Sequence, residues 1–188
     1  MKTVWTIVKG ILIGWGLFCA VGALCLVGLI SWTLLRAPSE SLDVTSSACE
    51  RKARGALNWC RLDAGRMEKV LHAYNSKRSF TGDHTDLYAI KVSRLEASEL
   101  TADAWGHGWT RCDQAEGVLK DAIEFASGWS GWAKNEKITW FPKGEELKSS
   151  DMFVYAWRIV CHGTRPTAIQ LMFARPSDKT VFYISVKT

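Results

Sequence analysis

No acidic residue occurs between Val4 and Leu35, and the only cation in this stretch is Lys9. The uninterrupted apolar run from Gly10 to Leu35 would extend roughly 39 Å as a helix, which exceeds the ~30 Å hydrocarbon core of a bilayer. This absence of charge argues against a water-exposed first segment. We therefore predict that residues 1–36 form a single transmembrane anchor.

A convincing signal-peptide cleavage site is also missing. A secretory apolar region usually has 7–15 residues and ends at a small-x-small site, whereas this run is longer and ends at Leu34, Leu35 and Arg36. We therefore expect the anchor to stay uncleaved in the inner (cytoplasmic) membrane. Lys2 and Lys9 favour a cytoplasmic N-terminus, although cations also follow the span. The short N-terminal tail and the cysteine count favour a periplasmic C-terminal domain.

Small residues recur at helical spacing within the predicted span. Gly10 and Gly14 form a GxxxG pair, and Gly16 with Ala20 forms a second small-xxx-small pair. Such faces allow two membrane helices to approach closely. They predict a helix partner in the membrane, and the alternative is that glycine is simply common in membrane helices.

The remainder of the chain has little net charge. Removing Lys2, Lys9 and Arg36 from the 24 cations leaves 21, against 19 acidic residues, or about +2. A nucleic-acid partner is therefore not expected, because such proteins carry a basic stripe. We predict a linker at residues 37–42, where Pro38 disfavours helix at Ala37, and one domain at residues 43–188.

Established catalytic and metal-binding motifs are absent. The chain has no Gly-x-Ser-x-Gly, Cys-x-x-Cys, His-Glu-x-x-His or phosphate-loop pattern. We therefore predict that the protein is not an enzyme and has no cofactor and no metal. Asp83, His84, Thr85 and Asp86 form a polar segment that would suit metal or proton handling, but a turn before a strand explains it more simply.

Four of the six cysteines lie in the predicted domain, at Cys49, Cys60, Cys112 and Cys161. If Cys49 and Cys60 share a helix, they are about 16 Å apart along its axis, too far for a disulfide. Two disulfides that join each of them to Cys112 or Cys161 are expected. The alternative is four buried thiols in a cytoplasmic domain.

Apolar periodicity predicts an α+β domain. Residues 43–75 carry an apolar stripe at spacings of three and four, which indicates one long helix. A strand is expected over 87–95, and a second helix from the Asp113/Glu116 capping signal to Ser127-Gly128. Three antiparallel strands follow, separated by turns at 162–166 and 176–179. In the first of them, one face is predicted to carry Phe153, Tyr155, Trp157, Ile159 and Cys161.

This order of elements, with a long helix packed on a curved antiparallel sheet, resembles the NTF2-like fold. It is also similar to the cystatin-like and type IV pilin arrangements. The NTF2-like resemblance implies a membrane-anchored secretion-system assembly protein, or a pocket between helix and sheet for a ligand or an enzymatic reaction. The pilin leader site and the early acidic residue are both missing from this sequence.

Two glycine-flanked tryptophan clusters stand out in segments predicted to be loops. They provide the candidate binding residues, because tryptophan is common at binding hot spots. The alternative is that these rings fold inward and fill the core. The candidate residues are Trp105, His107, Trp109, Trp129 and Trp132.

These observations predict a single-pass, non-catalytic binding or assembly protein of a bacterial envelope complex, such as secretion or pilus-like machinery. Its expected partners are the membrane and other envelope proteins, which bind through the membrane helix and the tryptophan loops. An envelope immunity or exclusion protein that inhibits an incoming toxin or phage is the alternative. A ligand-binding or enzymatic NTF2-like pocket is the third interpretation.

Overall fold

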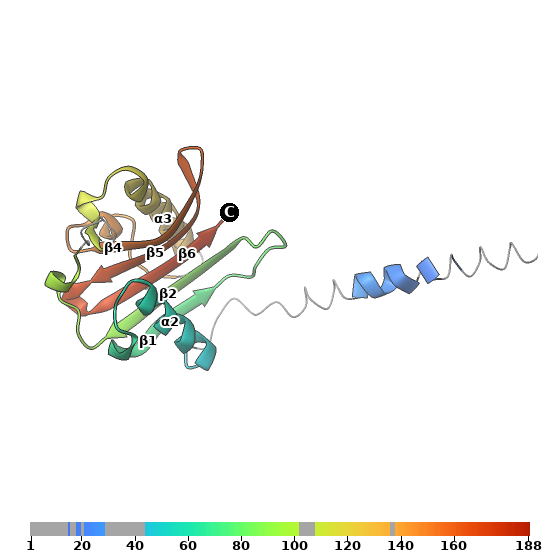
Figure 1. Cartoon of the computed structure of the whole chain (residues 1–188), viewed down its shortest axis with the longest axis horizontal. Helices are drawn as coiled ribbons and strands as arrows, with labels where there is room; N and C mark the ends of the chain where they lie inside the picture. Colours follow the sequence, from blue (N-terminus) through green and yellow to red (C-terminus); the bar gives the residue numbers. More distant parts are fainter. Residues whose placement is uncertain (1–14, 16–17, 20, 29–43, 102–107, 136–137) are drawn as a thin grey trace, which may run out of the picture. The chain divides into compact units, whose positions relative to one another are not determined.

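The computed structural model describes residues 15, 18–19, 21–28, 44–101, 108–135 and 138–188 (Figure 1). The chain divides into two units, Met1–Pro38 and Ser39–Thr188. The described residues of the first unit are helical. None of the helices in the described ranges is long and apolar enough to cross a bilayer. The predicted packing residues Gly10, Gly14, Gly16 and Ala20 lie outside these ranges, as does the linker at 37–42.

The second unit is an α+β domain built on one antiparallel sheet, as the sequence predicts. The strand order is β1-β2-β6-β5-β4-β3. Its two helices are α2 (Ser47–Trp59) and α3 (Gly117–Asn135). Its strands are β1 (Met67–Asn75), β2 (His84–Val92), β3 (Thr110–Arg111), β4 (Phe153–His162), β5 (Arg165–Arg175) and β6 (Thr180–Lys187). Short 3-10 helices occur at Ala64–Arg66, Ala97–Glu99, Cys112–Gln114, Glu146–Lys148 and Pro176–Asp178.

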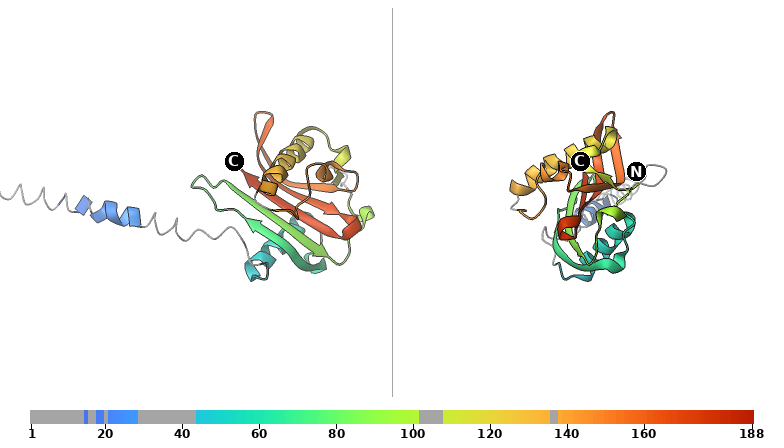
Figure 2. Two further views of the ribbon diagram at one scale, coloured as in Figure 1. Left: turned by 180° about the vertical axis from the view of Figure 1, so that it is seen from behind. Right: turned by 90° about the vertical axis from the view of Figure 1, so that its left-hand side faces the viewer.

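The two helices cover opposite faces of the sheet (Figure 2). We call these faces the α2 face and the α3 face. The α3 face is buried under α3 and includes Leu87, Ala89, Ile169, Leu171, Phe173, Phe182, Ile184 and Val186. The α2 face is buried under α2 and includes Tyr88, Ile90, Val92, Met172, Ala174, Val181 and Tyr183. Every residue of the central strand β6 except Lys187 is therefore buried, which explains its nearly continuous apolar sequence.

The long helix predicted at 43–75 is wrong. Helix α2 ends at Trp59, Arg61 adopts a left-handed conformation with φ of 61°, and Asp63 caps a 3-10 turn. Residues 67–75 then pair with β2 as strand β1. The β1–β2 register shifts within this strand, so apolar side chains three and four residues apart can be buried from a strand. Such spacing looks like the apolar stripe of a helix. The single long helix predicted at 43–75 is thus a shorter helix, α2, followed by a strand, β1.

The predicted end of the second helix at Ser127-Gly128 is also wrong. Helix α3 continues through both residues to Asn135. The Ser127 hydroxyl donates a hydrogen bond to the carbonyl of Ile123 at 2.9 Å, so this polar side chain is accommodated inside the helix. The predicted start is close, since α3 begins one residue after Glu116, while Asp113 forms an ion pair with Arg111.

The strand predicted at 87–95 is found three residues earlier, as β2, and the three strands predicted after residue 153 are confirmed as β4–β6. The prediction that alternate residues from Phe153 to Cys161 share one face of β4 is wrong beyond the centre of the strand. The register shifts at Trp157, so Phe153 and Tyr155 pack on the α2 face whereas Ile159 packs on the α3 face. The extra residue at this bulge leaves Trp157 49% exposed, stacked on Trp59 of α2.

The two expected disulfides are not found in the described part of the chain, where all of the cysteines are free thiols. The sheet separates the cysteines. Cys49 and Cys60 lie on the α2 face, Cys112 belongs to the core of the α3 face, and Cys161 is exposed near the end of β4. Burial raises the pKa of the Cys60 and Cys112 thiols to about 12.

Candidate functional site

The α2 face changes from apolar to polar along the strands. One cross-strand row of this face contains Ala174, Val181 and Ile90. The next row along the strands is aromatic and includes Tyr183 and Tyr88, whose rings are tilted against each other with centroids 6.0 Å apart. Burial raises the pKa of Tyr183 to about 12 and raises that of Tyr88 further, so both hydroxyls are neutral hydrogen-bonding groups at neutral pH.

Beyond the tyrosines, five polar residues from five strands lie side by side. The register pairs Asn75 with Asp86, Asp86 with Ser185, Ser185 with Gln170, and Gln170 with Arg158. We call these five residues the polar row. Because side chains opposite each other in antiparallel strands lie about 5 Å apart, the row is continuous across the sheet.

Asp86 is the charged centre of the row and is 2% exposed. Its Oδ2 accepts from the ammonium of Lys52 on α2 at 2.6 Å and from the guanidinium of Arg78 at 3.2 Å. Asn75, with its amide nitrogen toward the carboxylate, donates to Oδ1 at 2.9 Å and accepts from the Tyr88 hydroxyl at 3.0 Å. A buried carboxylate requires such partners, so this network fixes α2 and the β1–β2 hairpin to the polar row.

Ser185 is held by His84, the first residue of β2. The His84 Nδ1 lies 2.8 Å from the Gly82 carbonyl, which can only accept, so Nδ1 carries a proton. In the neutral imidazole, Nε2 is then the acceptor for the Ser185 hydroxyl at 3.0 Å. The Ser185 side chain is nearly fully buried, and this hydrogen bond orients it within the row.

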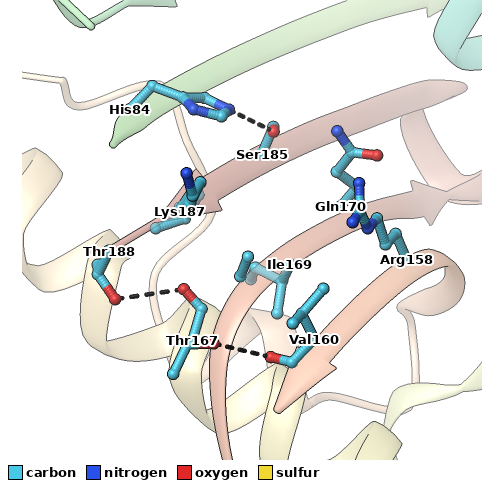
Figure 3. A pocket seen from close by; sticks show the side chains of 11 residues that line it. His84, Arg158, Val160, Thr167, Ile169, Gln170, Ser185, Lys187 and Thr188 are labelled. Carbon is cyan, nitrogen blue, oxygen red and sulfur yellow. Dashed lines mark hydrogen bonds between the residues drawn. The ribbon is translucent and has the colours of Figure 1, made fainter. Parts of the chain in front are cut away.

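Arg158 and Gln170 form the open end of the row. Neither side chain has a hydrogen bond or ion pair to any residue in the described ranges. Both line a pocket of about 280 Å³, together with His84, Ser185 and Lys187 (Figure 3). Figure 3 shows Arg158 and Gln170 next to each other on the two neighbouring strands. Lys187 donates to the Thr81 carbonyl at 2.6 Å. The pocket wall therefore carries two cations, Arg158 and Lys187, together with amide and hydroxyl groups.

Of the predicted tryptophan-cluster residues, the described side chains of Trp109 and Trp129 do not line this pocket. Trp105 and His107 lie outside the described residues. Trp109 is buried in the core of the α2 face, where its indole N–H donates to the Cys60 carbonyl at 3.1 Å. The segment with Trp129 and Trp132 belongs to helix α3, so the expected loop there is wrong.

Trp129 is partly buried against the α3-face core, where its ring meets Phe125 edge-on. The side chain of Trp132 lies outside the description. Among the described tryptophans of the second unit, exposure is concentrated at Trp157, which covers Trp59 at a ring distance of 5.8 Å. Among the described tryptophans of this unit, the most exposed ring therefore lies on the α2 face, beside the polar row.

Sequence reasoning missed most of the polar row. Ser185 and Gln170 occupy α2-face positions in two largely apolar strands. A polar residue at a position where the alternation predicts a buried apolar one was the sequence feature that could have indicated the row. Asp86 and His84 were singled out as part of a polar turn, yet both belong to β2. Within the described ranges, no group of three or more His, Cys, Asp or Glu side chains is arranged to hold a metal ion.

No protein-family description matches this chain, and neither a curated protein nor a solved structure is significantly similar to it.

Proposed function

We propose that this chain is a single-pass, membrane-anchored, non-catalytic binding protein of a bacterial envelope complex. Its C-terminal domain captures an anionic group, a carboxylate or a phosphate, in the pocket at the open end of the polar row. The observation that supports this function is the Arg158 guanidinium beside the Gln170 amide, both without partners in the described chain and both on the pocket wall.

The charges around the pocket support an anion rather than a cation. Arg158 and Lys187 line it, while the buried carboxylate of Asp86 is already neutralised by Lys52 and Arg78. A guanidinium presents several N–H donors in a fork that matches carboxylate and phosphate oxygens. The Gln170 amide adds a further donor, so an oxyanion would receive hydrogen bonds from two neighbouring strands.

We assign binding rather than catalysis to the His84–Ser185 pair. Ser185 is 2% exposed, and its hydroxyl is held by the part-buried hydrogen bond to His84. A nucleophile must reach the substrate, whereas a positioning group needs only a fixed orientation. The pair therefore keeps the floor of the pocket polar and rigid.

The membrane anchor and the orientation remain part of the proposal. The apolar run from Gly10 to Leu35 supports an anchor in the inner membrane, and Lys2 and Lys9 support a periplasmic domain. The proposed pocket differs from the one that the NTF2-like resemblance implies, because strands β2, β4, β5 and β6 line it and neither α2 nor α3 does. An assembly factor would bind a host subunit in this pocket, whereas an immunity or exclusion protein would bind a protein of the incoming toxin or phage.

Titration calorimetry on the full chain in mild detergent tests the binding function. Inorganic phosphate and succinate are the two probes. Arg158→Gln should weaken the binding of both at least tenfold. Arg51→Gln is the matched control, because Arg51 lies on the exposed side of α2 and its side chain bonds only Ser47. Failure of both anions to bind, or equal binding by the Arg158 variant, would refute the proposed function.

The anchor is tested separately by fractionation. The full chain should stay in the membrane pellet after alkaline carbonate extraction, and protease added to spheroplasts should degrade the C-terminal domain. Release by carbonate would remove the anchor, and protection from protease would reverse the orientation. Neither result depends on whether the pocket binds an anion.

A further inference from the structure

The outer edge of strand β4 is mostly open. Strand β3 pairs with β4 at Phe153 and Val154, near the start of the strand. From Trp157 to His162, no residue in the described ranges pairs with this edge. Edge strands present unpaired N–H and C=O groups that accept another strand. The open edge is about 20 Å long, enough for a six-residue segment.

This open edge adjoins the pocket. Arg158 and Val160 belong to the edge strand and also line the pocket. Val160 is 36% exposed, and Trp157 adds a large exposed ring at the start of the open stretch. A strand that paired with β4 would place one side chain directly opposite Arg158 on the α2 face, with the two Cβ atoms about 5 Å apart. That side chain would become the sixth member of the polar row.

We infer that the anionic ligand is an acidic side chain carried by an extended segment of a partner protein, which pairs with the outer edge of β4. This inference rests on the proposed function and identifies its ligand class. The acidic residue lies opposite Arg158, and an apolar residue two positions away lies opposite Val160. Backbone hydrogen bonds to β4 provide affinity, and the Arg158 pocket provides selectivity, as in other cases of strand addition.

Charge favours an acidic partner over a second copy of this chain. The open edge and its turn carry Arg158 and Arg165, and no acidic residue lies between Trp157 and Arg175. Antiparallel pairing of two β4 edges would bring these cations together, which is unfavourable. An acidic segment instead gains an ion pair with a guanidinium that has no partner in the described chain.

The test uses a fluorescein-labelled peptide of sequence Thr-Thr-Val-Thr-Glu-Thr-Val-Thr-Thr, which is symmetric and so fits in either strand direction. Binding to the full chain in detergent is measured by anisotropy. The Glu peptide should bind at least tenfold more tightly than the same peptide with Gln at the centre. Arg158→Gln should abolish this preference, and Arg51→Gln should preserve it.

Backbone pairing is tested without changing the protein. Alternate N–H groups of an extended peptide point to the same side, so N-methylation of every second amide removes the donors on one side and keeps the charge. Of the two peptides methylated in this way, the one that lacks the donors facing β4 should bind at least tenfold more weakly. Hydrogen exchange of the amides in residues 157–162 should slow when the unmodified peptide binds.

If succinate binds but the Glu peptide does not, the strand-pairing inference is wrong and the proposed function stands. If the peptide binds with no effect of N-methylation and no protection of 157–162, strand pairing is also refuted. If neither probe binds, both the inference and the proposed function fail.

Discussion

Two buried thiols predict how the stability of the domain depends on alkaline pH. Cys60 and Cys112 are buried on opposite faces of the sheet, and burial raises the pKa of each from 9.0 to about 12. Above pH 9 the unfolded chain releases these protons while the native protein retains them. Stability from the two thiols is therefore fully present below pH 9 and is lost as pH rises from 9 to about 12.

The size of the loss follows from the unfolded value. At pH 10 an unfolded thiol with a pKa of 9.0 is about 90% ionised, which stabilises the unfolded state by about 1.4 kcal/mol for each thiol. The pair should therefore lose about 2.7 kcal/mol between pH 8 and pH 10. The Cys60→Ala/Cys112→Ala double variant should lack this pH-dependent loss. The two small cavities lower its free energy of unfolding by the same amount at both pH values.

Urea unfolding of the full chain in detergent with reductant, followed by tryptophan fluorescence, measures this difference. The free energy of unfolding is compared at pH 8 and pH 10 in the original and double-variant proteins. Cys161→Ala is the control, because Cys161 is exposed and its substitution leaves both buried thiols in place. An equal loss of stability in the original protein and the double variant would refute the reasoning.

Three further predictions concern single residues. Lys52→Met should lower the free energy of unfolding by about 2 kcal/mol in urea titrations, because the buried Asp86 carboxylate loses its 2.6 Å partner; a loss below about 0.5 kcal/mol would contradict this. Cys161 should react with iodoacetamide in native, unreduced protein, and Cys60 should react only after denaturation; a need for reductant would restore the disulfide prediction. Trp109→Phe should cost about 1–2 kcal/mol in thermal or urea unfolding, because the Cys60 carbonyl loses its donor, and an unchanged stability would place that indole outside the core.

Much of the sheet could be predicted from sequence because alternation of apolar residues is a local property. Strands β2, β5 and β6 follow such patterns, and the turn at Pro176–Lys179 is confirmed by a 3-10 turn with Lys179 in a left-handed conformation. The same local rule failed where the register shifts. In β1 and at Trp157, an extra residue changes which side chains face the core.

The tryptophan prediction shows a second limit. Gly128 and Gly131 suggested a loop, yet both lie inside helix α3, where packing on the sheet outweighs the cost of about 1 kcal/mol for glycine in a helix. Trp109 was a candidate for exposure but fills the core of the α2 face. Whether an aromatic ring is buried depends on what covers it, and that partner is distant in sequence.

The sequence by itself determined the α+β class, most strand positions and the prediction of an N-terminal anchor, because each depends on composition or periodicity within one segment. Only the tertiary structure decided that α2 and α3 cover opposite faces and that five polar side chains form one row. That row depends on the register of five strands, from Asn75 on β1 to Arg158 on β4. Register is a property of strand pairs rather than of any strand, so the pocket becomes visible only after the sheet is assembled.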